Sequence, residues 1–229
     1  MKVLGIDEAG RGAVIGPMVL CGYMTDSKTL KKIEELGVKD SKELSPKRRN
    51  FLAKKLEKLP SEIFVLKIPP CKIDYNRTHG VNLNTLEAKK MAEIIDVLGP
   101  DIAIIDTPGT NTERFKQKVW SFLENKKVKL VCENFADKNY PIVSAASIIA
   151  KVERDKEIEE LKKQVGVDFG VGYSHDPLTI KFIEGLVKKH GDKLPSYVRK
   201  TWDTTQQILK KHKQKSLVSF LTKLLKKVE

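Results

Sequence analysis

Four acidic side chains stand at the ends of expected secondary-structure elements, and together they could hold divalent metal ions. Asp7 and Glu8 follow a short apolar strand expected over residues 1–6, and Asp106 ends another apolar strand. Asp137 comes just before a helix rich in small and apolar residues. Buried carboxylates need a cationic partner, and ligand sets made of oxygen favour Mg²⁺ or Mn²⁺ over zinc. Two such ions would neutralise four carboxylates and could clamp the attacking and leaving oxygens of a phosphodiester displacement.

The first two acids are adjacent, and adjacent side chains of a strand point to opposite faces. Asp7 and Glu8 can share one site if the backbone turns at Glu8, a turn that Gly10 and Gly12 would permit. These glycines also allow main-chain N–H groups to approach a ligand, and Arg11 adds a guanidinium group for phosphate. Taken alone, the segment fits a surface turn with two solvated acids better than a metal site. The acids further along the chain favour the metal site.

The elements that must position these acids alternate between strands and helices. Strands are expected at residues 1–6, 14–24, 62–68, 101–106 and 127–132. Helices are expected at residues 46–59, 84–98, 112–123, 145–163 and 177–190, with a partly helical stretch at 25–36 and a loop at 71–82. This order predicts an α/β fold whose mixed sheet is antiparallel at its start and parallel later. The first and fourth strands are expected to be neighbours, with the site beyond their ends.

Composition narrows the class of protein. The formal net charge of +13, from 43 lysines and arginines, favours a polyanionic partner such as nucleic acid. No apolar run is long enough to span a bilayer, and no signal peptide is expected. The cysteines Cys21, Cys71 and Cys132 are widely spaced among apolar residues, which indicates reduced thiols in a cytoplasmic protein. The chain lacks the P-loop motif and the G-x-S-x-G motif, so NTPase and serine-hydrolase chemistry are not indicated.

Three stretches resemble signatures of the type 2 ribonucleases H (ribonuclease HII) in their archaeal form. They are residues 5–12 with 15–17, residues 40–42 with 44–46, and residues 136–151. The resemblance covers residues 1 to about 200. It implies an RNase H-like fold and endonucleolytic hydrolysis of the RNA strand of RNA–DNA hybrids. It also implies cleavage 5′ of ribonucleotides embedded in duplex DNA, leaving 5′-phosphate and 3′-hydroxyl ends.

The same resemblance implies roles for individual residues. The catalytic and metal-binding set would be the four carboxylates, Asp7, Glu8, Asp106 and Asp137, holding two Mg²⁺ or Mn²⁺ ions. The segment Gly10, Arg11 and Gly12 would read the ribose 2′-hydroxyl, the group that distinguishes RNA from DNA, and Tyr173 would stack on the sugar past the junction. Further candidate substrate contacts are Ser41, Lys42, Lys138 and Lys151.

The C-terminal part of the chain is expected to be separate from the catalytic part. We expect an RNase H-like catalytic domain at residues 1–200, with a helical subregion at about 170–200, and a basic helical tail at 201–229. Within residues 214–221, the spacing of Gln214, Leu217, Phe220 and Leu221 matches a sliding-clamp-binding box, in which a short helical turn inserts apolar side chains into a pocket. The same spacing fits an amphipathic helix docked on the protein, and the surrounding lysines could bind duplex phosphates.

Two other functions remain open from the sequence. A different RNase H-like metal nuclease, such as a junction resolvase, would use the same acids and would cleave an all-DNA junction. A non-catalytic basic nucleic-acid-binding protein would bind in a salt-dependent way without metal-dependent turnover. We expect a monomer. The sequence leaves open which metal is used and whether continuous hybrids or single ribonucleotides are preferred.

Overall fold

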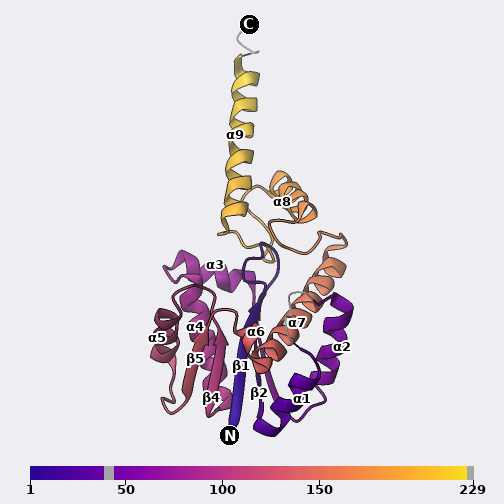
Figure 1. Ribbon diagram of the computed structural model, residues 1–229. Coiled ribbons are helices and arrows are strands. Elements are labelled where there is room, and N and C mark those ends of the chain that lie inside the picture. The colour runs from indigo at the N-terminus through magenta and orange to yellow at the C-terminus, as the bar shows by residue number, and fades with distance from the viewer. Residues whose placement is uncertain (39–43, 226–229) are drawn as a thin grey trace.

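A five-stranded mixed sheet forms the centre of the protein in the computed structural model, which describes residues 1–38 and 44–225, with side chains up to residue 214. The strand order is β3-β2-β1-β4-β5 (Figure 1). The first three strands pair antiparallel, and β4 and β5 continue the sheet in parallel. The bounds are β1 (Lys2–Ala9), β2 (Met18–Asp26), β3 (Glu62–Ile68), β4 (Ile102–Asp106) and β5 (Lys129–Glu133). The predicted mixed sheet is confirmed, and so is the pairing of the first and fourth strands.

Strand β1 lies in the middle of the sheet with both faces covered. Leu4 and Ile6 belong to the core on one face, whereas Val3 belongs to the core on the other. This double burial explains the unbroken apolar run in its sequence. Gly5 faces helix α7 (Pro141–Val165), because a Cβ at this position would lie 2.4 Å from the carbonyl oxygen of Ile142. The glycine therefore allows α7 to pack directly on the strand that carries Asp7.

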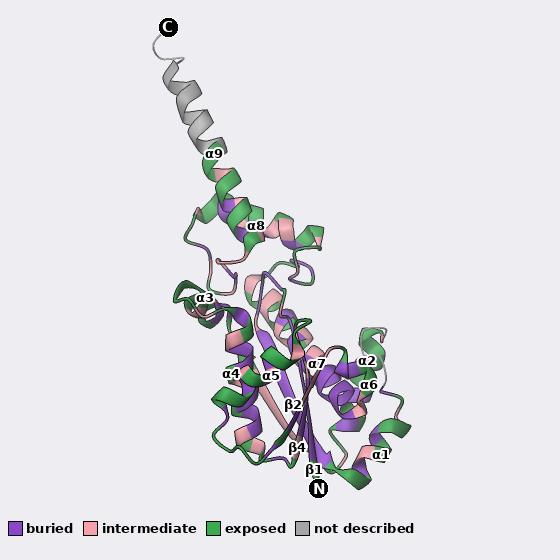
Figure 2. Cartoon of the chain, turned by 60° about the vertical axis from the view of Figure 1, so that its left-hand side comes forward, coloured by how far each residue is buried: buried purple, intermediate pink, exposed green. Residues whose placement is uncertain are grey.

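Helices cover both faces of the sheet. Helices α3 (Pro70–Thr78), α4 (Leu83–Leu98) and α5 (Thr112–Phe122) pack on one face. The other face carries α1 (Ser27–Glu35), α2 (Pro46–Leu56), α6 (Ala136–Asn139) and α7. Figure 2 shows the buried residues gathered between these helices and the sheet. Ser45 caps α2 by accepting a hydrogen bond from Arg48 N, and Pro46 occupies the first turn, as the sequence predicted.

Helices α8 (Pro177–His190) and α9 (Asp203–Leu225) stand beyond the carboxyl end of β1, far from the N-terminus (Figure 1). A third hydrophobic core joins them to the loop that follows β1. It includes Val14 and Ile15 of that loop, Ile183 and Val187 of α8, and Leu209 of α9. The loop between β1 and β2 is thus held between the sheet and the helical region. Across the described ranges, no helix is both long enough and apolar enough to cross a membrane.

Two expectations about local structure are wrong. The segment expected as a loop at 71–82 contains helix α3, because Pro70 occupies the first helical turn, where its missing N–H costs nothing. The backbone does not turn at Glu8, because Glu8 pairs with Leu20 and the strand continues to Ala9. The turn begins at Gly10, whose φ of 80° is accessible mainly to glycine.

Two further boundaries differ from the sequence-based expectation. The second strand begins at Met18 and not at residue 14, because residues 14 and 15 bond to Gly172 instead of to β1. Asp137 does not precede its helix but lies inside the short helix α6, which a break at Tyr140 separates from α7.

Candidate active site

Three aspartates converge at the carboxyl end of the central strands. One carboxylate oxygen from each of Asp7, Asp106 and Asp137 lies within 4.8 Å of those of the other two. The parallel pairing of Ile6 with Ile105 brings the first two together, because each aspartate follows its paired residue in adjacent strands. Asp137 is carried to the same edge by α6, which follows β5. Three of the four predicted acids therefore form one cluster.

Asp7 is the member of this cluster that lies on β1. Its side chain points toward α7, where Ser147 hydrogen-bonds to the carboxylate and Lys151 supplies a nearby positive charge. Burial raises the pKa of the Asp7 carboxyl above its usual value, and Lys151 and Ser147 only partly offset this. Lys151 Nζ also donates a hydrogen bond to Ser147 Oγ, so the two α7 residues act together on Asp7.

Glu8 points away from this α7 pair and is not a member of the three-aspartate cluster. Its backbone N–H donates to Asp7 Oδ1 at 2.7 Å. Burial raises the pKa of the Glu8 carboxyl well above its usual range, and the negative charges of Asp7, Glu87 and Asp106 raise it further. Glu8 is thus electrostatically coupled to the cluster from the other face of β1.

Hydrogen bonds and one unusual backbone conformation position the other two aspartates, Asp106 and Asp137. Asp106 Oδ1 accepts a hydrogen bond of 3.0 Å from Ala136 N, which ties β4 to the start of α6. Phe135 has a φ of 58° and is, among the described residues, the one non-glycine residue with a positive φ. Such a conformation costs on the order of 1 kcal/mol and is concentrated at functional sites. Ser144 Oγ donates to the carbonyl oxygen of Asp137 and fixes the turn into α7.

The cluster has the chemistry of a divalent cation site. Its donors are carboxylate oxygens, the ligand type that Mg²⁺ and Mn²⁺ prefer. Burial combined with like charge makes the bare carboxylates costly, and a cation would remove that cost. Asp7 and Asp137 are almost completely buried, at 4% and 0% exposure. The residues present therefore fit a divalent metal ion.

The loop after β1 is held from the side of the helical region by backbone contacts. Val14 N and Ile15 N both donate to the carbonyl oxygen of Gly172, and Gly16 N donates to that of Tyr197. Ala13 forms an isolated bridge with Tyr173. These contacts bring Tyr173 beside residues 10–16, so two predicted substrate-binding elements lie together.

Two buried arginines hold the loop at residues 10–16 and Tyr173 in position. Arg199 donates to the carbonyl oxygens of Gly10, Arg11 and Gly16, at distances of 2.6 to 3.2 Å. Arg154 donates to Val171 O at 2.9 Å, and its guanidinium lies 4.4 Å from the centre of the Tyr173 ring. Burial lowers the pKa of Arg199 to about 9, and the positive charge of Arg154 adds to this shift. The loop and Tyr173 thus depend on two cations within the protein.

Arg11 reaches from the loop to helix α4. Its Nε lies 2.8 Å from Glu87 Oε1 in an ion pair, and its Nη2 donates to Asn84 Oδ1 at 2.6 Å. Glu87 is fully buried, and burial outweighs the attraction of Arg11, so the pKa of Glu87 is raised to about 7. Gly12 is exposed, and a Cβ there would meet nothing within 4 Å. The loop therefore combines an anchored guanidinium with open backbone.

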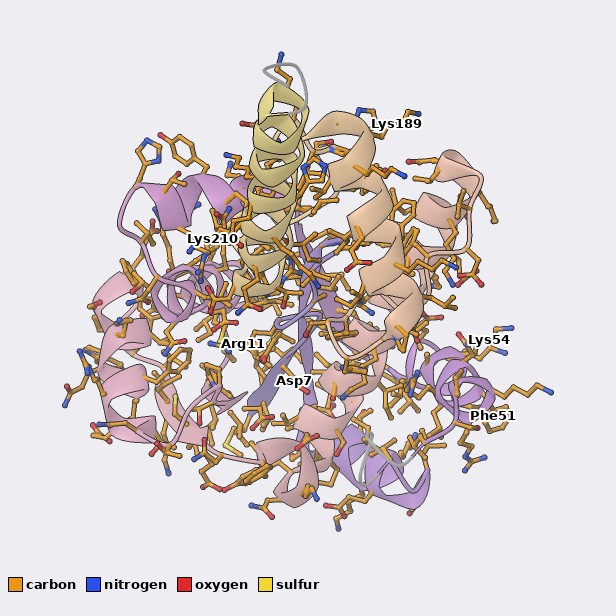
Figure 3. The ribbon with its side chains drawn as sticks, turned by 90° about the horizontal axis from the view of Figure 1, so that it is seen from above. Asp7, Arg11, Phe51, Lys54, Lys189 and Lys210 are labelled. Carbon is orange, nitrogen blue, oxygen red and sulfur yellow. The ribbon has the colours of Figure 1, made fainter. Side chains whose placement is uncertain are left out.

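Open grooves lie beside this loop. One of about 630 Å³ is lined by Arg11, Gly12, Asn84 and Trp202, among others. A second, of about 310 Å³, shares Asn84 with the first and extends to Arg114 and Lys118 on α5. The basic and amide side chains in both linings are suited to a phosphate backbone. Figure 3 shows Asp7 and Arg11 near the middle of the molecule when it is viewed from the α9 end.

The structure describes some of the other residues that the sequence predicted to contact substrate or a clamp. Lys151 lies at Asp7, as described above, whereas Lys138 is exposed, with its Nζ 6.0 Å from the centre of the Phe135 ring. Ser41 and Lys42 lie outside the described residues. Gln214 lies on α9. The side chains of Leu217, Phe220 and Leu221 also lie outside the described part.

Sequence reasoning missed several residues that shape the site. Ser147 could have been found, because Ser144, Ser147 and Lys151 share one face of a helix at spacings of three and four. Arg154, Arg199 and Glu87 carry no local signal. Their roles depend on partners far away in the sequence.

Comparisons with known proteins agree on one family. The sequence model of the family described as Ribonuclease HII matches residues 4–205. A ribonuclease HII from Methanothermobacter thermautotrophicus is 44% identical over 210 residues, covering 90% of this chain and 98% of that protein. The crystal structure of the ribonuclease H2 from Pyrococcus horikoshii OT3 matches with a TM-score of 0.83 and 39% identity, covering 92% and 98% of the two chains.

A second solved structure is a complex of PCNA and RNase HII from Archaeoglobus fulgidus. The chain matched in it has a TM-score of 0.80 and 40% identity, and the match covers 89% of this chain and 96% of that one. The resemblance found in the sequence motifs is confirmed by these matches, and so is the expected fold.

Proposed function

Because this chain belongs to the ribonuclease HII family, and is thus a metal-dependent endoribonuclease of RNA–DNA hybrids, we propose that it also cuts duplex DNA on the 5′ side of single embedded ribonucleotides. The products would carry 5′-phosphate and 3′-hydroxyl ends. The observation that supports this most directly is the continuity between the acidic cluster and the loop at residues 10–16. The strand that carries Asp7 leads directly into this loop, which bridges to Tyr173 through Ala13.

This continuity matters because one nucleotide must be recognised and cut at the same place. A single 2′-hydroxyl is the only feature that marks a lone ribonucleotide in DNA. Main-chain groups of Gly10, Arg11 and Gly12 would contact that hydroxyl, and Tyr173 would pack against the next sugar. Arg199 and Arg154 would keep the loop and Tyr173 at a constant distance from the aspartates, since they bond to both segments.

We propose that Asp7, Asp106 and Asp137 hold two divalent cations, with Glu8 completing the set from the opposite face of β1. When bound, these cations would activate water and stabilise charge on the transferred phosphate. Ser147 and the Glu8 N–H would orient the Asp7 carboxylate, while Lys151 would offset its charge. Arg11, anchored by Glu87 and Asn84, would bind a phosphate in the adjoining groove. Ser41, Lys42 and Lys138 remain further candidates for phosphate contacts.

The decisive experiment uses a labelled DNA duplex with one ribonucleotide, incubated with Mg²⁺ or Mn²⁺. The parent protein should cut 5′ of the ribonucleotide, the variant Asp137→Asn should not, and an all-DNA duplex should stay intact. Cleavage of the all-DNA duplex would indicate a broader nuclease. Tight binding without cleavage in either metal would instead indicate a non-catalytic binding protein.

We also propose that the residues at 214–221 bind a sliding clamp. Two observations support this. The spacing of Gln214, Leu217, Phe220 and Leu221 matches a clamp-binding box, and the related Archaeoglobus fulgidus protein was solved in a complex with PCNA. The backbone of this segment belongs to α9, which extends away from the sheet (Figure 1). Such a position would keep the box accessible while the site holds a duplex.

A truncation tests the clamp proposal separately from catalysis. Deleting residues 214–229 should abolish capture by an immobilised archaeal sliding clamp and leave cleavage of free substrate largely intact. Equal clamp capture by the truncated and full-length chains would contradict the proposal.

A further inference from the structure

We propose that the outward face of helix α2 binds the phosphate backbone of the substrate duplex at a distance from the cleavage site. This inference rests on the proposed function and extends it to a second contact surface. The surface consists of Lys47, Arg48, Phe51, Lys54 and Lys55 of the helix together with Lys58, two residues past its end, and we call it the α2 basic face. All six residues are exposed.

The spacing of these residues places them on one side of the helix. Successive members are one or three positions apart, so at 100° per residue the five within α2 fall within an arc of about 120°, with Phe51 near its centre. The opposite side carries Leu52, Ala53 and Leu56, which are buried against the sheet and α7. Packing therefore fixes the orientation of the helix and points the cations outward.

The described part of the protein offers no carboxylate partner to the cations of this face. Within the described ranges, none of its five basic side chains takes part in an ion pair. Helix α7 differs, because Lys156, Lys162 and Lys163 each pair with a glutamate three positions earlier. The α2 basic face thus presents a concentrated charge that a polyanion would complement.

Helix stability explains only part of this pattern. Lys54 and Lys55 lie in the last turn, where the helix dipole favours cations, but the first turn contains Lys47 and Arg48 and no acid, although the dipole disfavours cations there. Phe51 is 49% exposed, with the Arg48 guanidinium 5.2 Å and the Lys55 ammonium 5.6 Å from its ring centre. The ring thus positions two cations on an otherwise solvated surface, an arrangement suited to binding phosphates.

The helix is connected to the active site through α7. Arg49, on the inner side of α2, pairs with Asp155 at 3.0 Å. The neighbouring Arg154 contacts the Tyr173 ring. Figure 3 shows Phe51 and Lys54 pointing outward at the rim of the molecule, to one side of Asp7 and Arg11. A duplex that crosses the aspartates from the groove at Arg11 would continue toward this rim.

The dimensions of the face suit a duplex. From Lys47 to Lys55 the helix axis advances about 12 Å, at about 1.5 Å per residue. Phosphates follow one another about every 3.4 Å of axis along one DNA strand, so several lie within reach of the face. These contacts would add affinity that depends on duplex length and salt, with no effect on the chemistry at the aspartates.

The test compares binding of a long and a short RNA–DNA hybrid by Lys54→Ser/Lys55→Ser, with metal chelated so that no cleavage occurs. Each phosphate that the protein no longer neutralises reduces the slope of log affinity against log salt by about 0.9. On a hybrid of about 30 base pairs, the slope of the double variant should therefore be smaller by about 1.8. When salt is raised from about 50 to about 200 mM, the fold-loss of affinity of the double variant should therefore be about ten times smaller than that of the parent.

A matched control removes two exposed lysines at the opposite end of the sheet, as Lys127→Ser/Lys129→Ser, and its slope should equal that of the parent. A hybrid of about 10 base pairs should bind the parent and Lys54→Ser/Lys55→Ser equally. An unchanged slope on the long hybrid, an equal loss on both hybrids, or an equal loss in the control would each overturn the proposal. Cleavage of embedded ribonucleotides by the parent is measured in a separate assay, so failure of the proposed function can be distinguished from failure of the α2 proposal.

Discussion

The Arg199 Nη2 atom lies 2.6 Å from the carbonyl oxygen of Gly10, although 189 positions separate the two residues in the chain. This hydrogen bond joins the last loop before α9 to the first loop of the protein. The same guanidinium also bonds to the carbonyl oxygens of Arg11 and Gly16. One side chain from the helical region thus sets the conformation of the segment that follows the catalytic strand.

The variant Arg199→Lys should therefore lose stability and selectivity together. A lysine keeps the positive charge but cannot reproduce the planar fork that reaches three carbonyl groups. We expect the free energy of unfolding to fall by about 2 kcal/mol, measured by urea denaturation. Cleavage at a single ribonucleotide should fall more than cleavage of a continuous hybrid. Arg48→Lys, at an exposed arginine, should change stability by less than about 0.5 kcal/mol, and an equal effect of both variants would contradict this role for Arg199.

Metal binding should stabilise the folded protein through the aspartate cluster. Ligand binding raises the free energy of unfolding by RT ln(1 + [L]/Kd), or about 1.4 kcal/mol at ten times Kd. Mg²⁺ should raise the melting temperature of the parent, and Asp106→Asn should abolish most of that rise. In chelator, the same variant should melt at or above the parent temperature, because it removes one of three adjacent negative charges. A full Mg²⁺-dependent rise in the variant would place the cation elsewhere.

Glu87 should make stability depend on pH. Its pKa is raised by burial from 4.5 to about 7 in the folded protein. Between these values the folded state binds a proton that the unfolded chain has released, so the free energy of unfolding falls as pH rises through this window. The total change from this group is up to about 3 kcal/mol. The variant Glu87→Gln should flatten the profile of urea midpoint against pH, whereas Glu93→Gln, at an exposed position of α4, should leave it unchanged.

Gly5 should tolerate no side chain. A Cβ there would lie 2.4 Å from Ile142 O, and the neighbour is backbone that cannot move without shifting α7. We expect Gly5→Ala to lower the free energy of unfolding by more than about 2 kcal/mol. Gly185 is a matched control, because it lies inside α8 and a Cβ there would meet nothing within 4 Å. Gly185→Ala should raise stability by about 0.5 to 1 kcal/mol. Equal losses in both variants would show that close packing on α7 is not the cause.

Local sequence chemistry accounts for the parts of the fold that were predicted. Apolar runs marked the strands, and the Ser45–Pro46 pair marked the start of α2, because caps and periodicity act over a few residues. The acids at strand ends were visible for the same reason. If β1 and β4 are parallel neighbours, their carboxyl ends lie side by side, so Asp7 and Asp106 must be close together.

Only the tertiary structure decided which polar groups around the aspartate cluster interact with one another. It extended β1 through Glu8, which sent that carboxylate to the face opposite Asp7. It also brought Arg199 to Gly10 and Glu87 to Arg11. A buried charged group is stable only where distant segments supply its partners, and no short sequence window contains that information. The sequence by itself therefore determined the strands, the caps and the acids, and long-range packing determined which of them act together.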